Sequence, residues 1–403
     1  MPELGVHRVL LGLTGGIAAY KAAELCRLLV KDGVNVRVVM TDAACRFITP
    51  TTMQALSGQA VATDLWDRTI DDAMGHIELS RDRDCIVVAP ASADFLAKLA
   101  NGLADDLLST LCLARECPLL VAPAMNRQMW ENAATRRNVE QLRADGVIVL
   151  GPESGDQACG EIGMGRMLEA QQLHEAIMAA LQPKVLRGIR ILVTAGPTFE
   201  AIDPVRGLTN RSSGRMGYAV AQAALEAGAE VVLVSGPTAL AAPVNARVIR
   251  VTSAQEMLDV VLAEVPKAHV FIAVAAVADY RVKQTAAKKI KKSNQPMTLE
   301  LEPTVDILGT VSTGPNPPFC VGFAAESHDL DRFADEKRRR KKLPLLAANV
   351  AQDAIGATDN QLVLFDDRGK HVLPRQPKIE QARALIAHLA ELYKARCQPT
   401  SGL

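Results

Sequence analysis

The sequence predicts an α/β protein with two doubly wound domains, and three observations support this prediction. At 403 residues the chain is too long for a single core and suggests two domains. Its candidate strands are apolar throughout rather than alternating, which is typical of parallel sheets covered on both faces. An apolar strand, a glycine-rich turn, an amphipathic helix, a closing glycine and a second strand begin at His7, and the same plan recurs from Ile189.

Composition and charge indicate a protein without nucleic-acid or membrane partners. The 45 Lys and Arg residues balance 45 Asp and Glu residues. Apolar runs such as Val270–Ala278 are far shorter than the roughly 20 residues that span a bilayer. The first residues lack a basic region and a cleavage site, so no signal peptide is expected. The eight cysteines form no CxxC pair, and most have apolar or helical neighbours, as buried thiols do in a reducing compartment. We therefore expect a cytoplasmic protein.

The first domain is expected to span residues 1–185. After its opening strand, helix and second strand, further strands are predicted at Cys85–Ala89, Pro118–Val121 and Val147–Leu150, with helical patterns between them. This βαβ repetition predicts a doubly wound sheet with right-handed crossovers. A helix near Leu168–Leu181 leads to the domain boundary, which we place in Leu181–Gly188.

The second domain is expected to span residues 186–403. It repeats the opening plan, and Gly228 ends its first helix. The polar, basic segment Lys283–Pro296 is expected to be irregular, and an amphipathic helix at Lys378–Arg396 closes the domain.

Short polar residues at the predicted strand ends of the first domain indicate a ligand crevice. The Thr14-Gly15-Gly16 turn opens the first helix, where backbone N–H groups can bind phosphate, although a double glycine also fits a simple tight turn. No G-x-G-x-x-G is present, nor a spaced acidic residue for a ribose diol, so a mononucleotide fits better than a dinucleotide. The candidate binding residues are Thr14, Gly15, Gly16, Thr41, Ser92, Ser109, Thr110 and Met125.

The segment Gly151–Met167 holds five glycines and a single cysteine, Cys159. We expect it to keep neither a helix nor a strand, because glycine loses the most backbone entropy and proline lacks a donor. Residue type alone leaves the roles of Cys159 and His76 open. A lone thiol can be incidental, and a lone histidine is most often a surface or satisfied core residue.

The first domain resembles the flavin-dependent cysteine decarboxylases over nearly all of residues 1–180, in the segments "GGIAAYK", "GHIEL", "APASAD", "PAMN" and "ACGEIGMGRM". The resemblance implies a flavodoxin-like domain with FMN as its cofactor, and catalytic roles for His76, Asn126 and Cys159. His76 would serve the oxidative half, Asn126 would hold the substrate carboxylate, and Cys159 would protonate the enethiolate. FMN would supply the redox step that lets CO2 leave, and the glycines would let a flap carrying Cys159 close over the substrate.

The second domain has no P-loop pattern, yet it offers other groups for phosphate. Ser212-Ser213-Gly214 precede a predicted helix, where they can cradle phosphate or simply cap the helix. The basic clusters Lys288–Lys292 and Glu336–Lys342 suit a triphosphate, although a charge run is usually a solvated face. Asp279 and Asp306 are candidates for binding Mg2+ or a base edge.

This domain resembles the phosphopantothenate–cysteine ligases over most of residues 189–350, in "TAGPT", "DPVR", "TNRSSGRMG", "AAVADYR", "KIKK", "GFAAE" and "ANV". The resemblance implies a Rossmann-like nucleotide-binding domain that uses CTP. The carboxylate of 4'-phosphopantothenate would attack CTP to give an acyl-cytidylate, and the amine of cysteine would displace CMP. By this resemblance Lys289 holds the triphosphate, Asn210 turns over the acyl-cytidylate, and Asp279 contacts the nucleotide or Mg2+. The implied CTP site comprises Ser212, Ser213, Gly214, Ala273, Val274, Ala275, Asp279, Lys289, Val305, Asp306, Ile307, Leu308, Phe323, Lys337 and Lys341.

Two positions depart from the ligase pattern. Thr304 and Val305 stand where Asn and Pro are common, which is expected to loosen the turn before Asp306, and Arg215 replaces a common lysine.

Both domains together resemble the bifunctional bacterial enzymes of coenzyme A biosynthesis, in which the ligase product is the decarboxylase substrate. That resemblance implies a homo-oligomer, with trimers of the flavin domain and dimers of the ligase domain combined in a dodecamer.

Three other interpretations compete with this one. A flavin reductase with FMN in one domain and NAD(P)H in the other would need a dinucleotide fingerprint, which the second half lacks. A non-catalytic FMN-binding regulatory protein of the same fold could dispense with His76 and Cys159. A flavin prenyltransferase would need neither the Cys159 flap nor a ligase domain.

Overall fold

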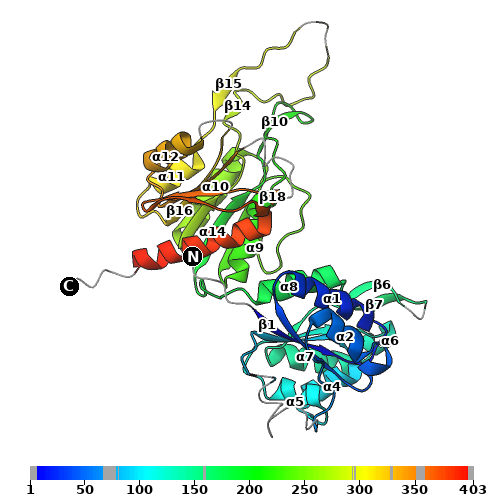
Figure 1. Cartoon of the computed structure of the whole chain (residues 1–403). Coiled ribbons are helices and arrows are strands. Elements are labelled where there is room, and N and C mark those ends of the chain that lie inside the picture. The colour runs from blue at the N-terminus through cyan, green and yellow to red at the C-terminus, as the bar shows by residue number, and fades with distance from the viewer. Residues whose placement is uncertain are drawn as a thin grey trace, which may run out of the picture. The chain divides into compact units, whose positions relative to one another are not determined.

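The computed structural model describes residues 7–66, 79, 81–157, 160–292, 294, 296–326, 330–350 and 359–397. It divides the chain into two compact units, Met1–Leu181 and Gln182–Leu403 (Figure 1). Within the described ranges, every helix is too short or too polar to cross a bilayer. The predicted catalytic residues His76 and Cys159 lie outside these ranges.

The first unit is built on a five-stranded parallel sheet with the order β2-β1-β3-β4-β5. This is the doubly wound flavodoxin order, in which the direction of strand addition reverses between β1 and β3. The observed order confirms the predicted fold class. The strands are β1 (Arg8–Leu13), β2 (Asn35–Met40), β3 (Cys85–Ala91), β4 (Leu119–Pro123) and β5 (Ile148–Val149).

Helices cover both faces of this sheet, which explains why its strands are apolar on both sides. Side chains of α1 and α8 pack with Val9 and Leu11 on one face, and those of α4, α5 and α7 pack with Leu10 and Ile86 on the other. The helical segments are α1 (Ala19–Lys31), η1 (Ala44–Arg46), α2 (Pro50–Ser57), α4 (Ala93–Ala100), α5 (Leu107–Leu113), α6 (Arg127–Glu131), α7 (Ala133–Ala144) and α8 (Ala170–Ala180).

Cys26, Cys85 and Cys112 belong to these cores and carry free thiols, as predicted. Burial raises the pKa of Cys26 to about 11 and the pKa values of Cys85 and Cys112 to about 12. These three side chains therefore stay protonated at neutral pH and act as small apolar groups.

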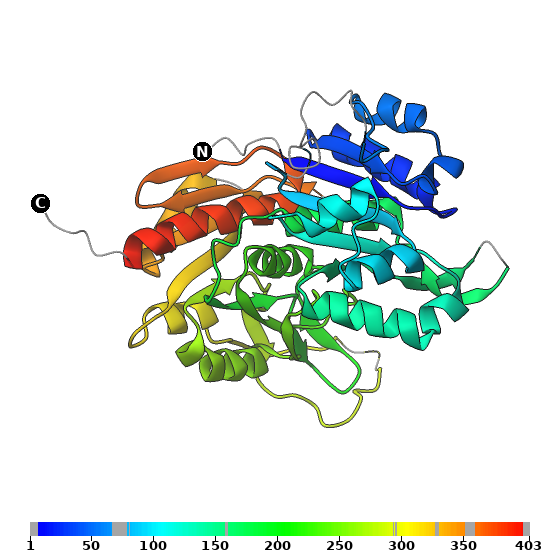
Figure 2. The same ribbon diagram turned by 90° about the horizontal axis from the view of Figure 1, so that it is seen from below.

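The prediction that Gly151–Met167 forms no strand is wrong. The segment forms an antiparallel hairpin of β6 (Glu153–Asp156) and β7 (Ile162–Arg166), which extends from the edge of the first unit in both views (Figures 1 and 2). Glycine serves close packing here. A Cβ on Gly165 would lie 2.4 Å from the Met125 carbonyl oxygen, and φ at Gly165 is +126°.

The second unit is built on an eight-stranded sheet with the order β12-β11-β8-β13-β16-β17-β19-β20. The strands from β12 to β17 in this order run parallel, and β19 and β20 continue the sheet as an antiparallel hairpin. The strands are β8 (Arg190–Ala195), β11 (Glu230–Ser235), β12 (Arg247–Arg250), β13 (Val270–Ala273), β16 (Phe319–Glu326), β17 (Leu345–Val350), β19 (Val363–Asp366) and β20 (Gly369–Val372).

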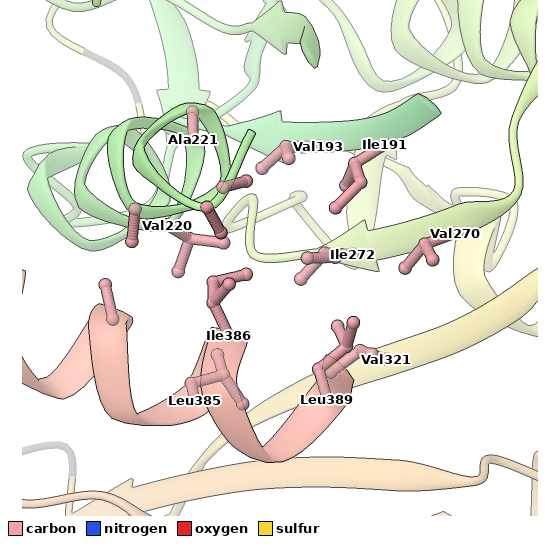
Figure 3. Close-up of a cluster of buried hydrophobic side chains, with 14 of the residues drawn as sticks. Ile191, Val193, Val220, Ala221, Val270, Ile272, Val321, Leu385, Ile386 and Leu389 are labelled. Atoms are coloured by element: carbon pink, nitrogen blue, oxygen red, sulfur yellow. The ribbon is translucent and has the colours of Figure 1, made fainter. Parts of the chain in front are cut away.

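Two helices, α9 and α14, cover one face of this sheet (Figure 3). Leu385, Ile386 and Leu389 of α14 are at most 1% exposed and pack on β8, β13 and β16. Full burial of one such side chain contributes roughly 1.5–3 kcal/mol. The opposite face is covered by α10, α11 and α12. The helical segments are α9 (Arg215–Glu226), α10 (Ala254–Glu264), η2 (Val265–Lys267), α11 (Ile307–Ser312), α12 (Leu330–Arg340) and α14 (Lys378–Cys397).

Three two-stranded ladders decorate the second unit. The predicted irregular segment Lys283–Pro296 lies between β14 and β15, and this arm projects from the unit in both views (Figures 1 and 2). The ladders pair β9 (Phe199–Ala201) with β10 (Gly207–Thr209), β14 (Tyr280–Val282) with β15 (Leu301–Pro303), and β18 (Asp359–Asn360) with β21 (Gln376–Pro377).

Candidate functional site

The first unit has a cavity of about 500 Å³ at the carboxyl ends of β1, β2 and β3. It lies where the direction of strand addition reverses, which is where doubly wound sheets bind ligands. The predicted residues Thr14, Gly15, Thr41 and Ser92 line it. The structure thus brings together residues that lie far apart in the sequence.

Thr14 joins the two strands at this point. Its hydroxyl donates a hydrogen bond to the Pro90 carbonyl oxygen (2.7 Å) and accepts one from the Ser92 backbone N–H (2.9 Å). The side chain is 2% exposed. Thr14 therefore fixes the ends of β1 and β3 relative to each other, so that the cavity wall is held in place.

The glycine turn leaves room for a phosphate group. A Cβ on Gly15 would lie 2.6 Å from the Ala43 Cβ, so glycine permits the turns after β1 and β2 to approach each other. Among the residues that the structure describes, a Cβ on Gly16 would have one atom within 4 Å, Pro90 Cγ at 3.9 Å. The residue before α1, Ala18, provides no side-chain cap, so it leaves the first N–H groups of α1 without a side-chain acceptor.

Ser109 and Thr110 do not line this cavity. The Ser109 hydroxyl donates to the Asp106 carbonyl oxygen (3.0 Å) and accepts from the Asp106 N–H (3.1 Å), which completes a capping box at the start of α5. The Thr110 hydroxyl also donates to the Asp106 carbonyl oxygen (2.8 Å). At this position Asp105, Asp106, Leu107 and Leu108 form the wall.

Several other wall residues were not predicted, among them Trp66 and Lys98. Trp66 lines the cavity and is 81% exposed. Lys98 lines it as well, and its Nζ lies 2.8 Å from an Asp105 carboxylate oxygen. This hydrogen bond raises the pKa of Lys98. A tryptophan in a polar segment was the available signal for Trp66, whereas the Lys98 pairing depends on the fold.

The β6–β7 hairpin is fastened to the turn that carries Asn126. Asn126 caps α6, since its side-chain oxygen accepts from the Met129 N–H (3.0 Å). The Met125 N–H donates to the Gly165 carbonyl oxygen (3.0 Å), and the Arg127 N–H donates to the Gln157 side chain (3.0 Å). Met125 thus contacts the hairpin rather than lining the cavity. These hydrogen bonds hold the described residues of the hairpin beside Asn126.

The predicted nucleotide residues of the second unit line one cavity of about 850 Å³ at the carboxyl ends of β8, β13 and β16. Its walls come from the start of α9, the segment after β13, the turn before α11 and the end of α12. The predicted residues that line it are Asn210, Ser212, Ser213, Gly214, Ala273, Val274, Ala275, Asp279, Val305, Asp306, Ile307, Leu308, Phe323, Lys337 and Lys341.

Gly214, rather than either serine, is the capping residue of α9. It adopts a left-handed conformation (φ +77°) and provides no side-chain cap. The N–H groups at the start of α9 therefore lack a capping side chain beside the cavity. Asn210 ties the two walls together, because its side-chain amide donates to the carbonyl oxygens of Ala276 (3.2 Å) and Val277 (3.0 Å).

Asp306 and Lys341 form an ion pair at the cavity, with Lys341 Nζ 2.7 Å from a carboxylate oxygen. Asp306 also caps α11 by accepting from the Gly309 N–H (3.0 Å). Burial raises the pKa of Asp306, but the hydrogen bonds from Lys341 and Gly309 outweigh it and leave the pKa below its ordinary value. The carboxylate is therefore ionised at neutral pH.

The turn before Asp306, which was expected to be loosened, is held by two hydrogen bonds of Thr304. The Thr304 N–H donates to the Asp279 carbonyl oxygen (2.9 Å), and the Thr304 hydroxyl donates to the Ala278 carbonyl oxygen. These bonds anchor the turn to the segment after β13, so Thr304 compensates for the missing proline.

Lys289 does not line the cavity of its own chain. The arm that carries it is docked on Asp203 and Arg206. The Ile290 N–H donates to the Asp203 carboxylate (3.1 Å), and Arg206 donates to the Ile290 carbonyl oxygen (2.8 Å). The hydrogen bond from Arg206 to Asp203 holds the pKa of Asp203 well below its usual range.

Several residues that line this cavity were not among the predicted site residues, and Arg215 was noted only as a departure from the ligase pattern. Arg215, Asn349, Asn360 and Lys378 line the cavity. Lys378 is 9% exposed, and burial lowers its pKa, with the charge of Arg215 adding to the effect. Asn349 belongs to the quoted "ANV" segment. Lys378 opens the last helix, where no local pattern marks it as a ligand residue.

The two doubly wound sheets, each with a cavity at the carboxyl ends of its strands, define a ligand-binding α/β protein of two units. Residues 2–182 match the Flavoprotein family, and residues 186–393 match the DNA/pantothenate metabolism flavoprotein C-terminal domain. The chain belongs to the family of the coenzyme A biosynthesis bifunctional proteins CoaBC, which confirms the predicted resemblance.

Relatives match almost the whole chain. The CoaBC protein of Vibrio vulnificus (strain CMCP6) is 48% identical over 401 residues, covering 96% of this chain and 100% of the relative. The CoaBC protein of Escherichia coli (strain K12) is 44% identical over 399 residues, covering 97% and 98%. A solved structure of the FMN-dependent cysteine decarboxylase SpaF is 36% identical, covers 43% of this chain and 95% of its own, and gives a TM-score of 0.39. Membership of a bifunctional family over its full length favours the two-enzyme interpretation over a flavin reductase or a regulatory protein.

Proposed function

We propose that this protein catalyses two consecutive steps of coenzyme A biosynthesis. The second unit joins cysteine to 4'-phosphopantothenate, and the first unit decarboxylates the resulting phosphopantothenoylcysteine to 4'-phosphopantetheine. The observation that carries the proposal is the full-length match to the bifunctional family, in a chain whose two units each have a cavity at the carboxyl ends of their strands.

FMN is the proposed cofactor of the first unit. The residues present fit its phosphate, because the space beside Gly16 is open and the start of α1 lacks a side-chain cap. Thr14, Gly15, Gly16, Thr41 and Ser92 would hold it, with Ser109, Thr110 and Met125 supporting the surrounding loops. When bound, FMN would supply the redox chemistry that lets CO2 leave the substrate.

The chain's own groups would bind the substrate and move protons. Asn126 presents its side-chain amide next to the hairpin, where it can hold the substrate carboxylate. Cys159 would protonate the enethiolate, and His76 would serve the oxidative half of the reaction. The hairpin, docked on the Asn126 turn, would exclude water from the reacting carbon.

CTP is the proposed co-substrate of the second unit, and Mg2+ is its proposed metal ion. The cations Lys337, Lys341, Arg215 and Lys378 line one cavity with the start of α9, which suits a triphosphate. Asp279 is exposed at the same cavity, where its carboxylate can share Mg2+ with phosphate oxygens. Asn210 would act on the acyl-cytidylate intermediate.

Lys289 supports a proposal about assembly. Because it lies on a projecting arm and does not line its own cavity, it would reach bound triphosphate by closure of the arm or from a second copy. We propose dimers of the second unit and trimers of the first, combined in a dodecamer. A cytoplasmic location is also proposed, on the strength of the buried free thiols.

The test is to record the visible spectrum of the purified protein, supply 4'-phosphopantothenate, cysteine, CTP and Mg2+, and follow CO2 and pyrophosphate. A flavin spectrum with CO2 release that depends on CTP would support both activities. Supplying phosphopantothenoylcysteine directly should release CO2 without CTP, which isolates the first unit. A colourless protein, with no CTP-dependent pyrophosphate, would overturn the proposal.

A further inference from the structure

Three metal-binding side chains meet outside both cavities. Asp366 ends β19, His371 lies in β20, and His388 lies on α14. His371 Nε2 is 3.2 Å from one carboxylate oxygen of Asp366, and His388 Nε2 is 2.8 Å from the other. Among the residues that the structure describes, Asp366, His371 and His388 form the one group of three or more His, Cys, Asp or Glu side chains that lie close enough together to hold a metal ion.

The geometry is close to that of a metal site. One ligand atom from each residue lies within 4.8 Å of the other two, and the histidine rings converge at a centroid distance of 4.7 Å. Metal–nitrogen bonds of roughly 2.0–2.1 Å place tetrahedral ligands about 3.4 Å apart. Small side-chain rotations therefore suffice to admit an ion between the three groups.

Asp366 is prepared as an anionic ligand. Its side chain is 1% exposed, and one carboxylate oxygen accepts from the N–H groups of Arg368 (2.7 Å) and Gly369 (3.0 Å). Hydrogen bonds that orient a ligating carboxylate are a regular feature of metal sites.

The histidines leave the cluster open to water on one side. His371 is 37% exposed and His388 is 18% exposed at their side chains. An ion can enter from this side, and water can complete its coordination. Two imidazole nitrogens and one carboxylate suit Zn2+, Co2+ or Ni2+, whereas Mg2+ and Ca2+ prefer oxygen ligands alone.

We propose that Asp366, His371 and His388 bind one divalent transition-metal ion of the Zn2+ class. The ion joins the β19–β20 hairpin to α14. Because β19 pairs with β17, and Asn349 of β17 lines the large cavity, the metal steadies the part of the sheet next to that cavity. This inference does not depend on the proposed function.

The test uses the full-length protein after treatment with EDTA, titrated with Zn2+ alone in a calorimeter and with Co2+ alone in a spectrophotometer. We expect one ion per chain at this site and a thermal unfolding midpoint that rises with Zn2+. His371→Gln and His388→Gln should each weaken Zn2+ binding at least tenfold and remove the thermal shift. His7→Gln is the matched control, since His7 also lies beside a carboxylate, 3.5 Å from Asp84, and no second histidine of the described residues pairs with that carboxylate.

Equal Zn2+ affinity in the wild type and both histidine variants, or no binding at all, would show a hydrogen-bonded cluster only and would overturn the proposal. Excess Mg2+ that displaces Zn2+ from the site would refute the assigned metal class. Asp366→Asn is expected to abolish binding; if it does not fold, the decision rests on His371→Gln, whose side chain is the most exposed of the three.

Discussion

Lys21 of α1 is hydrogen-bonded to Glu169, with 2.9 Å between Lys21 Nζ and Glu169 Oε1, and Nζ also donates to the Met167 carbonyl oxygen at 2.8 Å. Lys21 is 4% exposed, and Arg166 contacts the same carboxylate. The helix that follows the glycine turn is thus joined to the chain that leaves the β6–β7 hairpin. The hydrogen bond from Lys21 lowers the pKa of Glu169.

Replacing Lys21 with methionine should destabilise the first unit. The change leaves the Met167 carbonyl oxygen without its charged donor, which should lower the free energy of unfolding by about 1–3 kcal/mol. Loss of the ion pair with Glu169 should add little, because that carboxylate is half-exposed. Urea unfolding followed by flavin fluorescence would measure it. Lys31→Met, on the exposed end of the same helix, is the control. Equal midpoints for the two variants would contradict the prediction.

Gly165→Ala should impair decarboxylation selectively. The added Cβ would lie 2.4 Å from the Met125 carbonyl oxygen, and alanine disfavours φ of +126°. Strain of about 1–3 kcal/mol would displace the hairpin from the Asn126 turn, and a barrier raised by that amount slows CO2 release roughly 5- to 150-fold.

The matched control for this change is Gly155→Ala, whose Cβ would lie nearest to the flexible side chain of Arg166. CTP-dependent pyrophosphate release by the second unit should be unchanged in both variants. A Gly165→Ala protein that releases CO2 at the wild-type rate would show that hairpin docking is not needed.

Lys341→Ala should weaken CTP use. The variant loses a cavity cation and leaves the Asp306 carboxylate unpaired beside the phosphate groups, so we expect KM for CTP to rise about tenfold, which corresponds to roughly 1.4 kcal/mol. Lys342→Ala is the neighbouring control, because Lys342 does not line this cavity. An unchanged KM would place the triphosphate elsewhere.

Asp203→Asn should make the free energy of unfolding less dependent on pH in the acid range. The hydrogen bond from Arg206 lowers the pKa of Asp203 from an ordinary value near 3.8. The stability that the ionised Asp203 contributes is therefore present above pH 3.8 and is lost as the pH falls toward the folded-state pKa. The wild type should therefore exceed the variant in stability at pH 7, and the gap should narrow at pH 3. Denaturant midpoints at both pH values would show this, and a constant gap would argue against it.

The sheets were predictable because their signals are local. Strands that are apolar on both faces, glycines that close helices and polar residues at strand ends all lie within short segments, as in Thr14–Gly16. The cavity residues of the second unit followed from the same rule, since parallel strands end at one edge.

The remaining features depend on contacts between distant segments. The glycines of the β6–β7 hairpin suggested mobility, yet Gly165 is needed where the hairpin touches Met125. Ser109 was expected to face a ligand, but its hydroxyl completes a helix cap with Asp106. Lys378 reaches the cavity only because α14 packs across the sheet, and no local pattern encodes that.

The long sheet of the second unit ends in two short strands that carry cations. β12 has Arg247 and Arg250 at its ends, and β20 carries Lys370, which pairs with Asp331 at 2.6 Å. Unpaired backbone groups at a sheet edge are templates on which further chains can add strands, and short, charged edges discourage that addition. The edge strands β12 and β20 therefore oppose aggregation in which further chains add strands to the eight-stranded sheet.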